Sequence, residues 1–443
     1  MASSLQMAGF ERPYVVSWNL TYRCNLACDH CYLDAGGSPL VASEAFSDRS
    51  ELDTDQCKKV VDDIAAFAPE ALTILTGGEP LLRRDLLQII RYANEKDLWV
   101  VVGTNGVSIT PTLAQLLLNE GVRGLALSLD ALDPERHDRF RAVKGAWNNT
   151  VRGASILHDV GLPFIVQTTV GRHNLDELEQ IAEFAYEKMS AKVWNLYFLV
   201  QTGRGQFVSD IEPDEYDRVL ATLHELQERY RDRMIVNAKC APHYVKTVFE
   251  RDPDSPFLKS YSGGAGGCPA GTHYMGIRPN GDVTPCPYLP MFGGNLKNES
   301  LSDVWEHSEL FQDMRRRSEL GGRCGSCEFN ATCGGCRARA HGVTGDVLAE
   351  DPLCSYQPGA FPDAAEKLAA PAIEYGAQTA APDIAVEWEP AARERMKRIP
   401  AFVRGMVTRA VESHCAKNGI AVVTEAELET IRSRMPTPKV FGR

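Results

Sequence analysis

The sequence has no long apolar run and no excess of positive charge. No stretch of about 18 or more consecutive apolar residues occurs, which excludes an ordinary membrane-spanning helix. The N-terminus also lacks the basic and then apolar segments that mark a secretory signal. The net charge of −12 would repel phosphate backbones, so nonspecific nucleic-acid binding is disfavoured. We therefore expect a cytoplasmic protein whose partners include neither a membrane nor nucleic acid.

Cysteine, by contrast, is abundant, with thirteen in 443 residues. In a cytosolic protein of this size, that number indicates metal binding rather than disulfides. Three cysteines follow a predicted apolar strand, Val15 to Leu20, in the spacing CxxxCxxC: Cys24, Cys28 and Cys31. Thiolates favour iron–sulfur clusters, and three of them can hold three corners of a 4Fe–4S cube. A fourth cysteine at comparable spacing is lacking, so one iron would stay open for a substrate. A structural zinc loop is the alternative, and it usually needs paired CxxC knuckles.

Polar motifs follow three further predicted strands. Thr76 to Pro80 (TGGEP) follows ALTIL, Thr104 to Gly106 (TNG) follows LWVVV, and Ser128 to Asp130 (SLD) follows GLAL. In a barrel of parallel strands, these carboxyl ends carry the active site. The glycines allow a close approach of the backbone to a ligand, and the carboxylate of Glu79 suits a cationic amine.

In this order the motifs resemble the radical S-adenosylmethionine (radical SAM) superfamily. The resemblance implies that Cys24, Cys28 and Cys31 are catalytic and hold a 4Fe–4S cluster whose open iron chelates S-adenosylmethionine. It also implies an electron donor such as ferredoxin or flavodoxin. The cosubstrate contacts implied by the resemblance come from the strand ends: Gly77, Gly78, Glu79, Pro80, Thr104, Asn105, Ser128, Asp130, Thr168 and Arg204.

Some of these strand-end residues have a plain structural alternative. Capping of loop ends would explain Thr168, Thr169, Asn174 and Arg204 equally well. Near the cysteine loop, four other side chains could border the adenine: Trp18, Asn19, His30 and Tyr32. Trp18 and Asn19 could instead fill the floor of the barrel.

Between residue 14 and about residue 200, six β-rich runs alternate with helical windows. The windows lie at Asp55 to Phe67, Asp85 to Glu95, Leu113 to Asn119 and Asp176 to Lys188. Such βα units predict an α/β fold with a parallel sheet and right-handed crossovers. Six units rather than eight fit the partial, TIM-like (βα)6 barrel of the resembled superfamily, which we assign to residues 14–235.

A second cysteine group lies between residues 268 and 354 and contains CxxCxxxxxCxxC: Cys268, Cys286, Cys324, Cys327, Cys333, Cys336 and Cys354. So many thiols in a polar, Gly-rich segment are not explained as buried hydrophobes, and two zinc sites are the alternative. The segment, residues 236–356, resembles the SPASM extension of radical SAM enzymes, which carries auxiliary 4Fe–4S clusters.

By the family's pairing, Cys324, Cys327, Cys333 and Cys354 hold one auxiliary cluster. Cys268, Cys286 and Cys336 hold the other, which leaves either Cys240 or the substrate as its fourth ligand. Cys57 and Cys415 lie on amphipathic helices and are interpreted as core or surface thiols.

After an Ala- and Pro-rich linker at 357–383, residues 384–443 predict a small helical module. Pro390 suits a first helical turn, apolar residues recur at helical spacing from Met396 to Ala410, and Thr424 with Glu427 predicts a capping box. The module resembles the C-terminal domain of light-independent protochlorophyllide reductase. It holds eleven basic and seven acidic residues from Glu387 onward, which would attract a carboxylate-rich macrocycle or simply form a solvated face.

Within the SPASM group, the stretches CGGCRARA, AEDPLC and KCAPHY resemble tetrapyrrole-tailoring enzymes most. The resemblance implies that a radical removes hydrogen from a heme-type side chain, for example in oxidative decarboxylation of a propionate to a vinyl group. An auxiliary cluster would then take the surplus electron. Arg337 and Arg339 could pair substrate carboxylates, and His243 or His273 could ligate the macrocycle's iron, with a structural role as the alternative for each.

Two rival functions are a SPASM maturase of a ribosomally made peptide and a noncatalytic iron–sulfur electron carrier. The maturases often carry a leader-binding domain at the N-terminus, and only about a dozen residues precede the first predicted strand here. An electron carrier would have no use for strand ends that bind methionine.

Overall fold

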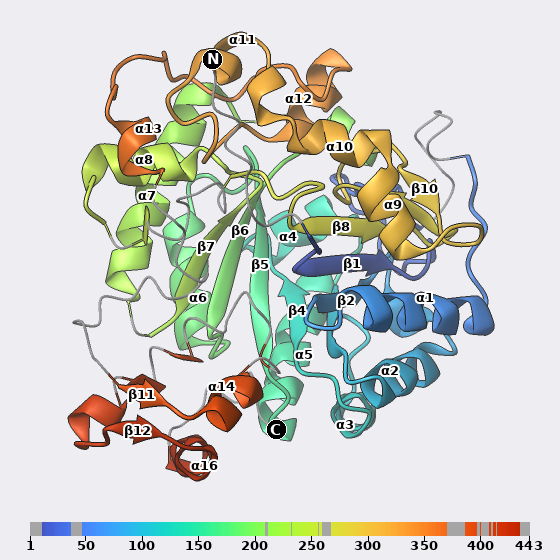
Figure 1. The fold of residues 1–443 in the computed structure, drawn as a ribbon. Helices are drawn as coiled ribbons and strands as arrows, with labels where there is room; N and C mark the ends of the chain where they lie inside the picture. The colour runs from blue at the N-terminus through green and yellow to red at the C-terminus, as the bar shows by residue number, and fades with distance from the viewer. Residues whose placement is uncertain are drawn as a thin grey trace.

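The computed structural model describes residues 11–36, 47–208, 211–231, 233–255, 257–258, 267–369, 386–396, 399, 407–408, 411–412 and 414–434. At its centre lies one ten-stranded sheet, ordered β10-β9-β8-β1-β2-β3-β4-β5-β6-β7 (Figure 1). The strands β1 to β7 all run parallel to their neighbours. Their bounds are β1 (Val15–Asn19), β2 (Leu72–Thr76), β3 (Trp99–Thr104), β4 (Leu125–Ser128), β5 (Phe164–Val170), β6 (Val193–Phe198) and β7 (Ile235–Lys239).

Helices between the strands cover the outer face of the sheet, as right-handed βα crossovers require. They are α1 (Thr54–Phe67), α2 (Leu86–Glu95), α3 (Pro111–Asn119), α4 (Pro134–Arg141), α5 (Ala146–Val160), α6 (Leu178–Glu187) and α7 (Pro213–Arg229). The four helices predicted from the sequence are confirmed, with shifts of up to two residues at their ends. Trp18 is fully buried between sheet and helices, so it fills the core rather than bordering an adenine.

The sheet is longer than the six predicted strands. β7 begins at the predicted boundary between barrel and SPASM segment, and β8 (Tyr274–Ile277) pairs in parallel with β1. β9 (Asp282–Thr284) and β10 (Gly294–Asn295) then add antiparallel strands. Because β8 extends the barrel sheet, the second cysteine group is joined to the first by continuous backbone pairing.

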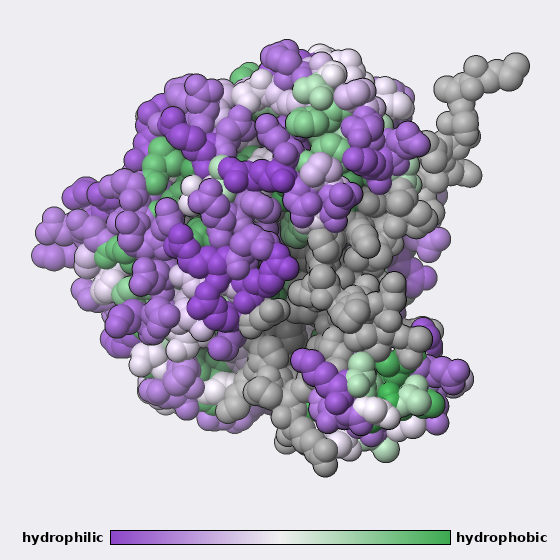
Figure 2. Space-filling view, turned by 90° about the vertical axis from the view of Figure 1, so that its left-hand side faces the viewer, coloured by the Kyte–Doolittle hydropathy of each residue, from purple (hydrophilic) through white to green (hydrophobic). Residues whose placement is uncertain are grey.

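The SPASM segment forms short helices above one end of the sheet (Figure 1). They are α8 (Tyr244–Arg251), α9 (Leu301–His307), α10 (Glu309–Arg315), η6 (Arg317–Glu319), α11 (Gly322–Ser326) and α12 (Arg337–Thr344). The segment predicted as a linker begins with a further short helix, α13 (Ala364–Lys367), whose Ala364 is buried in the main core. Figure 2 shows that the face over the outer helices is mostly hydrophilic, as expected for amphipathic helices that turn their apolar side to the sheet.

The C-terminal module has a small core of its own, which contains Cys415. β11 (Glu387–Trp388) pairs in parallel with β12 (Val422–Val423), a contact that the sequence did not predict. Two helices of the module have described bounds, α14 (Pro390–Met396) and α16 (Glu425–Arg434). Thr424 Oγ1 accepts from Glu427 N at 3.0 Å, which is half of the predicted capping box.

The predicted apolar stripe from Met396 to Ala410 falls largely outside the described residues. Cys57 and Cys415 are both fully buried, so each is a core thiol. None of the helices in the described ranges is long and apolar enough to cross a bilayer.

Candidate functional site

The first three cysteines lie on the loop that leaves the carboxyl end of β1. Backbone amides of Leu26 and Ala35 donate to the sulfurs of Cys24 and Cys31 at 3.4 and 3.3 Å. Arg141 Nη1 donates to Cys28 Sγ at 3.7 Å. Donors aimed at sulfur favour the thiolate, the form in which cysteine binds iron. Burial opposes that form and raises the pKa of Cys24 to about 12, so a thiolate here needs the positive charge that iron supplies.

Arg204 holds this loop from the end of β6. Its Nε donates to Cys28 O at 2.8 Å, and its Nη1 donates to Asp34 Oδ1 at 3.0 Å. Its backbone amide donates to Cys31 O at 2.9 Å. The structural alternative for Arg204 therefore accounts for its buried guanidinium, and its contact with S-adenosylmethionine stays a prediction.

The two glycines of TGGEP serve the cysteine loop. A Cβ on Gly78 would lie 2.3 Å from Arg23 O, and one on Gly77, at φ +143°, would lie 2.8 Å from Thr21 O. The amide of Gly78 donates to Thr21 O at 2.7 Å. Pro80 opens the short helix η2 (Pro80–Leu82) directly behind them. The close approach expected at these glycines is thus made by the cysteine loop's own backbone.

Glu79 ties this motif to the next strand end. Its Oε1 accepts from Thr104 Oγ1 at 2.8 Å and from Leu81 N at 3.1 Å, and its Oε2 accepts from Asn105 N at 2.9 Å. Burial raises the pKa of Glu79 to about 7 despite these donors. Asn105 Nδ2 in turn donates to Asn25 Oδ1 on the cysteine loop at 2.8 Å. Glu79 therefore connects the ends of β2 and β3 through buried hydrogen bonds, and its contact with the amine of the cosubstrate stays a prediction.

Asp130 of the SLD motif reaches the same loop through Arg141, a residue that the sequence did not single out. Asp130 Oδ2 accepts from Arg141 Nε at 2.6 Å, and its Oδ1 accepts from Thr169 N at 2.8 Å. Burial opposes ionisation, but Arg141 outweighs it and lowers the pKa of Asp130 to about 2. The same guanidinium reaches Cys28, so the ion pair connects the end of β4 with the Cys28 thiol. No sequence spacing marks Arg141, which ends a helix rich in other charged residues.

The remaining strand-end predictions have mixed outcomes. The Thr168 hydroxyl donates to Leu129 O at 2.7 Å and accepts from Trp194 Nε1 at 2.8 Å. Asn174 Nδ2 donates to Asp130 O at 2.7 Å. These bonds fit the capping alternative for Thr168 and Asn174. Ser128 is half-buried at the end of β4, and its role stays a prediction.

Four half-buried tyrosines lie between the two cysteine groups: Tyr32, Tyr197, Tyr274 and Tyr288. Tyr32 follows Cys31, and its ring centroid lies 4.9 Å from that of Tyr288, two residues after Cys286. The Tyr32 hydroxyl donates to Asn19 Oδ1 at 2.6 Å, so Asn19 orients this ring. We name these four side chains the tyrosine wall.

His30 lies on the other side of Cys31. Its ring stacks on Phe140, with centroids 4.2 Å apart, and Phe140 stacks on His173 at 3.8 Å. The predicted contact of His30 with the adenine stays a prediction.

Four cysteines of the second group interact with one another around α11 and the start of α12: Cys324, Cys327, Cys333 and Cys354. Amides of Phe329 and Gly335 donate to Cys327 Sγ and Cys333 Sγ, both at 3.4 Å. Gly334 and Gly335 both have φ of +63°, and this left-handed turn accommodates the tight Cys333–Cys336 spacing.

The other three cysteines of this group lie closer to the barrel. The side chains of Cys268 and Cys336 are hydrogen-bonded, and Cys286 packs against the same buried cluster. Amides of Ala270 and Tyr288 donate to Cys268 and Cys286. As at Cys24, Cys327 and Cys333, the donor belongs to the residue two positions after the cysteine. This repeated geometry fits thiolate ligands.

Zinc is the alternative for these cysteines. A zinc site places its thiolates at about 2.3 Å from one ion. Within the described ranges, no group of three or more His, Cys, Asp or Glu side chains is placed to hold one metal ion. A cuboidal cluster instead binds each thiolate to its own iron, so its ligands stand farther apart. The match of this segment to an iron–sulfur cluster-binding domain, rather than the cysteine geometry, is what favours clusters over zinc.

The structure favours the structural alternative for Arg337 and Arg339, and the role of His243 stays a prediction. Arg337 is 1% exposed and donates to the carbonyls of Val347 and Ala349 at 2.8 and 2.6 Å. Arg339, also 1% exposed, forms an ion pair with buried Asp351, and the His243 ring is enclosed by Asp351 and Tyr216. Helix α12 turns both arginines into the protein. His273 is half-buried beside Tyr14, and its role stays a prediction.

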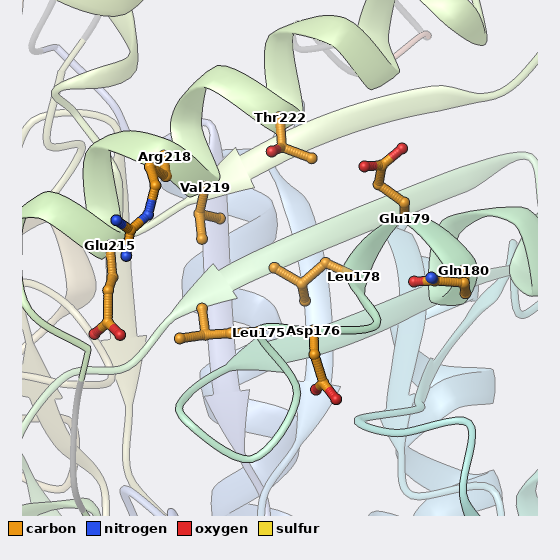
Figure 3. A pocket seen from close by; sticks show the side chains of 9 residues that line it. All are labelled: Leu175, Asp176, Leu178, Glu179, Gln180, Glu215, Arg218, Val219 and Thr222. Atoms are coloured by element: carbon orange, nitrogen blue, oxygen red, sulfur yellow. The ribbon is translucent and has the colours of Figure 1, made fainter.

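A pocket of about 290 Å³ lies between α6 and α7 on the outer layer (Figure 3). It is lined by mixed polar and apolar side chains such as Asp176, Glu215 and Val219. No cysteine lines it, so it is separate from the site described above.

Residues 18–185 match the family model of the Radical SAM superfamily, residues 268–328 match the SPASM iron–sulfur cluster-binding domain, and residues 388–432 match the proto-chlorophyllide reductase 57 kD subunit. An AdoMet-dependent heme synthase from Methanosarcina barkeri is 37% identical over 352 residues, which cover 78% of this chain and 97% of that relative. An Fe-coproporphyrin III synthase from the same organism is 28% identical over 372 residues, covering 79% of this chain and 89% of the relative. The structure of Streptococcus suis SuiB bound to precursor peptide SuiA is 18% identical, has a TM-score of 0.62, and covers 78% of this chain and 76% of its own.

Proposed function

The chain belongs to the radical SAM superfamily, and from that premise we propose that it cleaves S-adenosylmethionine reductively and oxidatively decarboxylates propionates of an iron porphyrin. The similarity to an AdoMet-dependent heme synthase supports this substrate class. The match of the C-terminal module to a proto-chlorophyllide reductase subunit supports a tetrapyrrole independently.

Cys24, Cys28 and Cys31 would hold the first cluster. When bound, the reduced cluster and S-adenosylmethionine supply a 5′-deoxyadenosyl radical, which takes a hydrogen atom from an unactivated carbon. The chain's own part is to fix the loop. Arg204 holds the loop's carbonyls, Asn105 holds Asn25, and Arg141 donates to Cys28. Such rigid support is what positions a reacting carbon against a cofactor.

The electron balance of the reaction requires an acceptor. When a propionate loses one hydrogen atom and then carbon dioxide to leave a vinyl group, one electron remains for each propionate. An auxiliary cluster on Cys268, Cys286 and Cys336 would take that electron.

One observation carries the proposal. The first and second cysteine groups meet across the tyrosine wall, where the rings of Tyr32 and Tyr288 lie 4.9 Å apart. A substrate beside this wall would lie between the first cysteine group, where S-adenosylmethionine would bind, and the auxiliary cluster that would accept the electron.

The tyrosine wall suits a flat macrocycle that carries carboxylates. Aromatic faces pack against a porphyrin plane, and phenol hydroxyls other than that of Tyr32, which donates to Asn19, can donate to carboxylate oxygens. Because Arg337 and Arg339 are buried and paired within the protein, the tyrosines are the better candidates for contacting the propionates.

The test is anaerobic turnover of the reconstituted protein with iron coproporphyrin III, S-adenosylmethionine and dithionite. We expect vinyl-bearing product by mass spectrometry, with one 5′-deoxyadenosine formed per vinyl group. A chain that cleaves S-adenosylmethionine but modifies only a peptide encoded beside its gene would favour the maturase. A chain that cleaves none would favour the electron carrier.

A further inference from the structure

Cys240 directly follows β7, at the carboxyl end of the barrel sheet. Its backbone has a φ of +57°, in the left-handed region that side chains other than Gly, Asn and Asp rarely adopt. Strained backbone of this kind persists where the surroundings fix it, and it clusters at functional sites. The strained backbone therefore indicates that the cysteine at this position has a functional role.

The Cys240 side chain lies among the thiols of the incomplete cluster. Cys240 and Cys286 both pack against the buried cluster that contains Cys268 and Cys336. Cys240 also interacts electrostatically with each of those three thiols. It is the fourth cysteine of one group of four, and it comes from the end of β7 rather than from residues 268–354, which hold the other three.

A buried hydrogen-bond bridge fixes Cys240 relative to Cys336. Asp351 Oδ2 accepts from Cys336 N at 2.6 Å and from Arg339 Nη2 at 2.7 Å. Arg339 Nη1 then donates to Cys240 O at 3.1 Å. Both Asp351 and Arg339 are at most 1% exposed, so the bridge is rigid. Arg339, which the sequence analysis expected to face the substrate, therefore serves this bridge instead.

The other nearby candidate for a ligand is His243, whose Nε2 is buried without a hydrogen-bond partner among the described residues and faces the Asp351 carboxylate. His243 Nδ1 is hydrogen-bonded to Tyr216 Oη at 2.8 Å, and its Nε2 lies 3.6 Å from Asp351 Oδ2. The residue two positions after Cys240 is Pro242, which has no amide to donate to the sulfur. Cys240 therefore lacks the amide donor that Cys268 and Cys286 have, and the case for it rests on its position among the other three thiols.

We propose that Cys240 is the fourth protein ligand of the auxiliary cluster held by Cys268, Cys286 and Cys336. The proposal rests on the proposed function, in which this segment binds that cluster. Four thiolates close the cluster, so it accepts electrons without binding the substrate. The porphyrin is then held by other groups, such as the tyrosine wall.

The test uses a background in which Cys24, Cys28 and Cys31 are all alanine, so that only auxiliary clusters remain. Cys240→Gly keeps the left-handed backbone and removes the thiol, so a loss of iron cannot come from backbone strain. Cys240→Asn and Cys240→Asp form a matched pair, because both tolerate this φ and only the carboxylate is a good ligand. Cys415→Ala, in the core of the C-terminal module, is the control.

The readouts are iron and sulfide per chain and the electron paramagnetic resonance (EPR) spectrum of the reduced clusters, with and without imidazole. We expect the triple-alanine variant to hold two clusters, and its EPR spectrum should not change when imidazole is added. Cys240→Gly and Cys240→Asn should lose about half of the iron or gain an imidazole-sensitive signal, Cys240→Asp should retain more iron, and Cys415→Ala should match the background.

Two results would overturn the proposal. If Cys240→Gly keeps both clusters with an unchanged spectrum, or if imidazole already shifts the background spectrum, Cys240 is not a ligand although the auxiliary clusters exist. If the background holds no cluster at all, the premise fails as well, and the two failures are thereby distinguished.

Discussion

Arg141→Met is predicted to shift the reduction potential of the first cluster in the negative direction. Arg141 Nη1 lies 3.7 Å from Cys28 Sγ, and the side chain is 9% exposed, so solvent screens it little. A unit charge about 6 Å from a cluster contributes about 3 kcal/mol at an effective dielectric constant of about 20. For one electron, that energy corresponds to roughly 120 mV. Asp130 offsets part of this field, so we expect a shift of about 50 mV, within that limit.

The same substitution leaves Asp130 buried without its cation. Removing one partner of a buried ion pair costs about 3–5 kcal/mol of the free energy of unfolding. The double variant Asp130→Asn, Arg141→Met removes both charges and should recover most of that loss. Anaerobic denaturant titration of the apoprotein measures both values, and it separates destabilisation of the fold from the change in potential.

The potential is measured by redox titration, with the EPR signal of the first cluster identified by its change on addition of S-adenosylmethionine. Arg136→Met is the control, since Arg136 lies on the same helix but pairs with Asp176 on the surface. An equal shift in both variants, or no shift in Arg141→Met, would refute the contact between Arg141 and the cluster.

Three further predictions concern Gly78, Glu79 and the tyrosine wall. Gly78→Ala should cost about 1–3 kcal/mol and lower iron retention, because the added Cβ meets Arg23 O at 2.3 Å. Gly161→Ala, at φ +77° but with nothing within 4 Å of the added Cβ, is the control for backbone strain without a clash, and equal iron retention in the two would contradict the packing argument. Burial places the pKa of Glu79 near 7 in the folded chain, above its ordinary 4.5, so its contribution to stability is present below pH 4.5 and is lost as the pH rises toward 7. Glu79→Gln should flatten that part of the stability–pH profile, and an unchanged profile would contradict it. Tyr288→Phe should raise the KM for the porphyrin several-fold while leaving the KM for S-adenosylmethionine unchanged, and a rise in both would remove the wall from substrate binding.

Much of the architecture could be predicted because strands and helices have periodic sequence patterns. Val15 to Leu20 predicted β1 closely, and the glycine motifs were placed correctly at strand ends. β7 and β8 were missed, because the apolar residues of IVNAK are broken by Asn237 and Lys239 and YMGI is only four residues long. Their place in the sheet depends on pairing with distant strands, which a local pattern does not contain.

The ion pairs that support the site could not be predicted, because the partners of a buried ion pair need not lie at any fixed spacing in the sequence. Arg141 and Asp130 are eleven residues apart, and Arg339 and Asp351 are twelve apart, with no motif linking either pair. Arg339 was expected at the substrate because it follows Cys336 closely in sequence. The structure shows that this proximity serves the opposite purpose, since the turn of α12 carries the guanidinium inward to Asp351.

The central claim is that the loop of Cys24, Cys28 and Cys31 holds a cluster with one open iron that binds S-adenosylmethionine. Electron–nuclear double resonance on the reduced protein, with the cosubstrate labelled with ¹⁵N at its amino group, tests that claim most directly. We predict a nitrogen coupling to the cluster that disappears in Cys28→Ala and persists in Cys57→Ala, whose thiol lies in the core. A fully reduced first cluster that shows no such coupling in the unaltered protein would contradict the account.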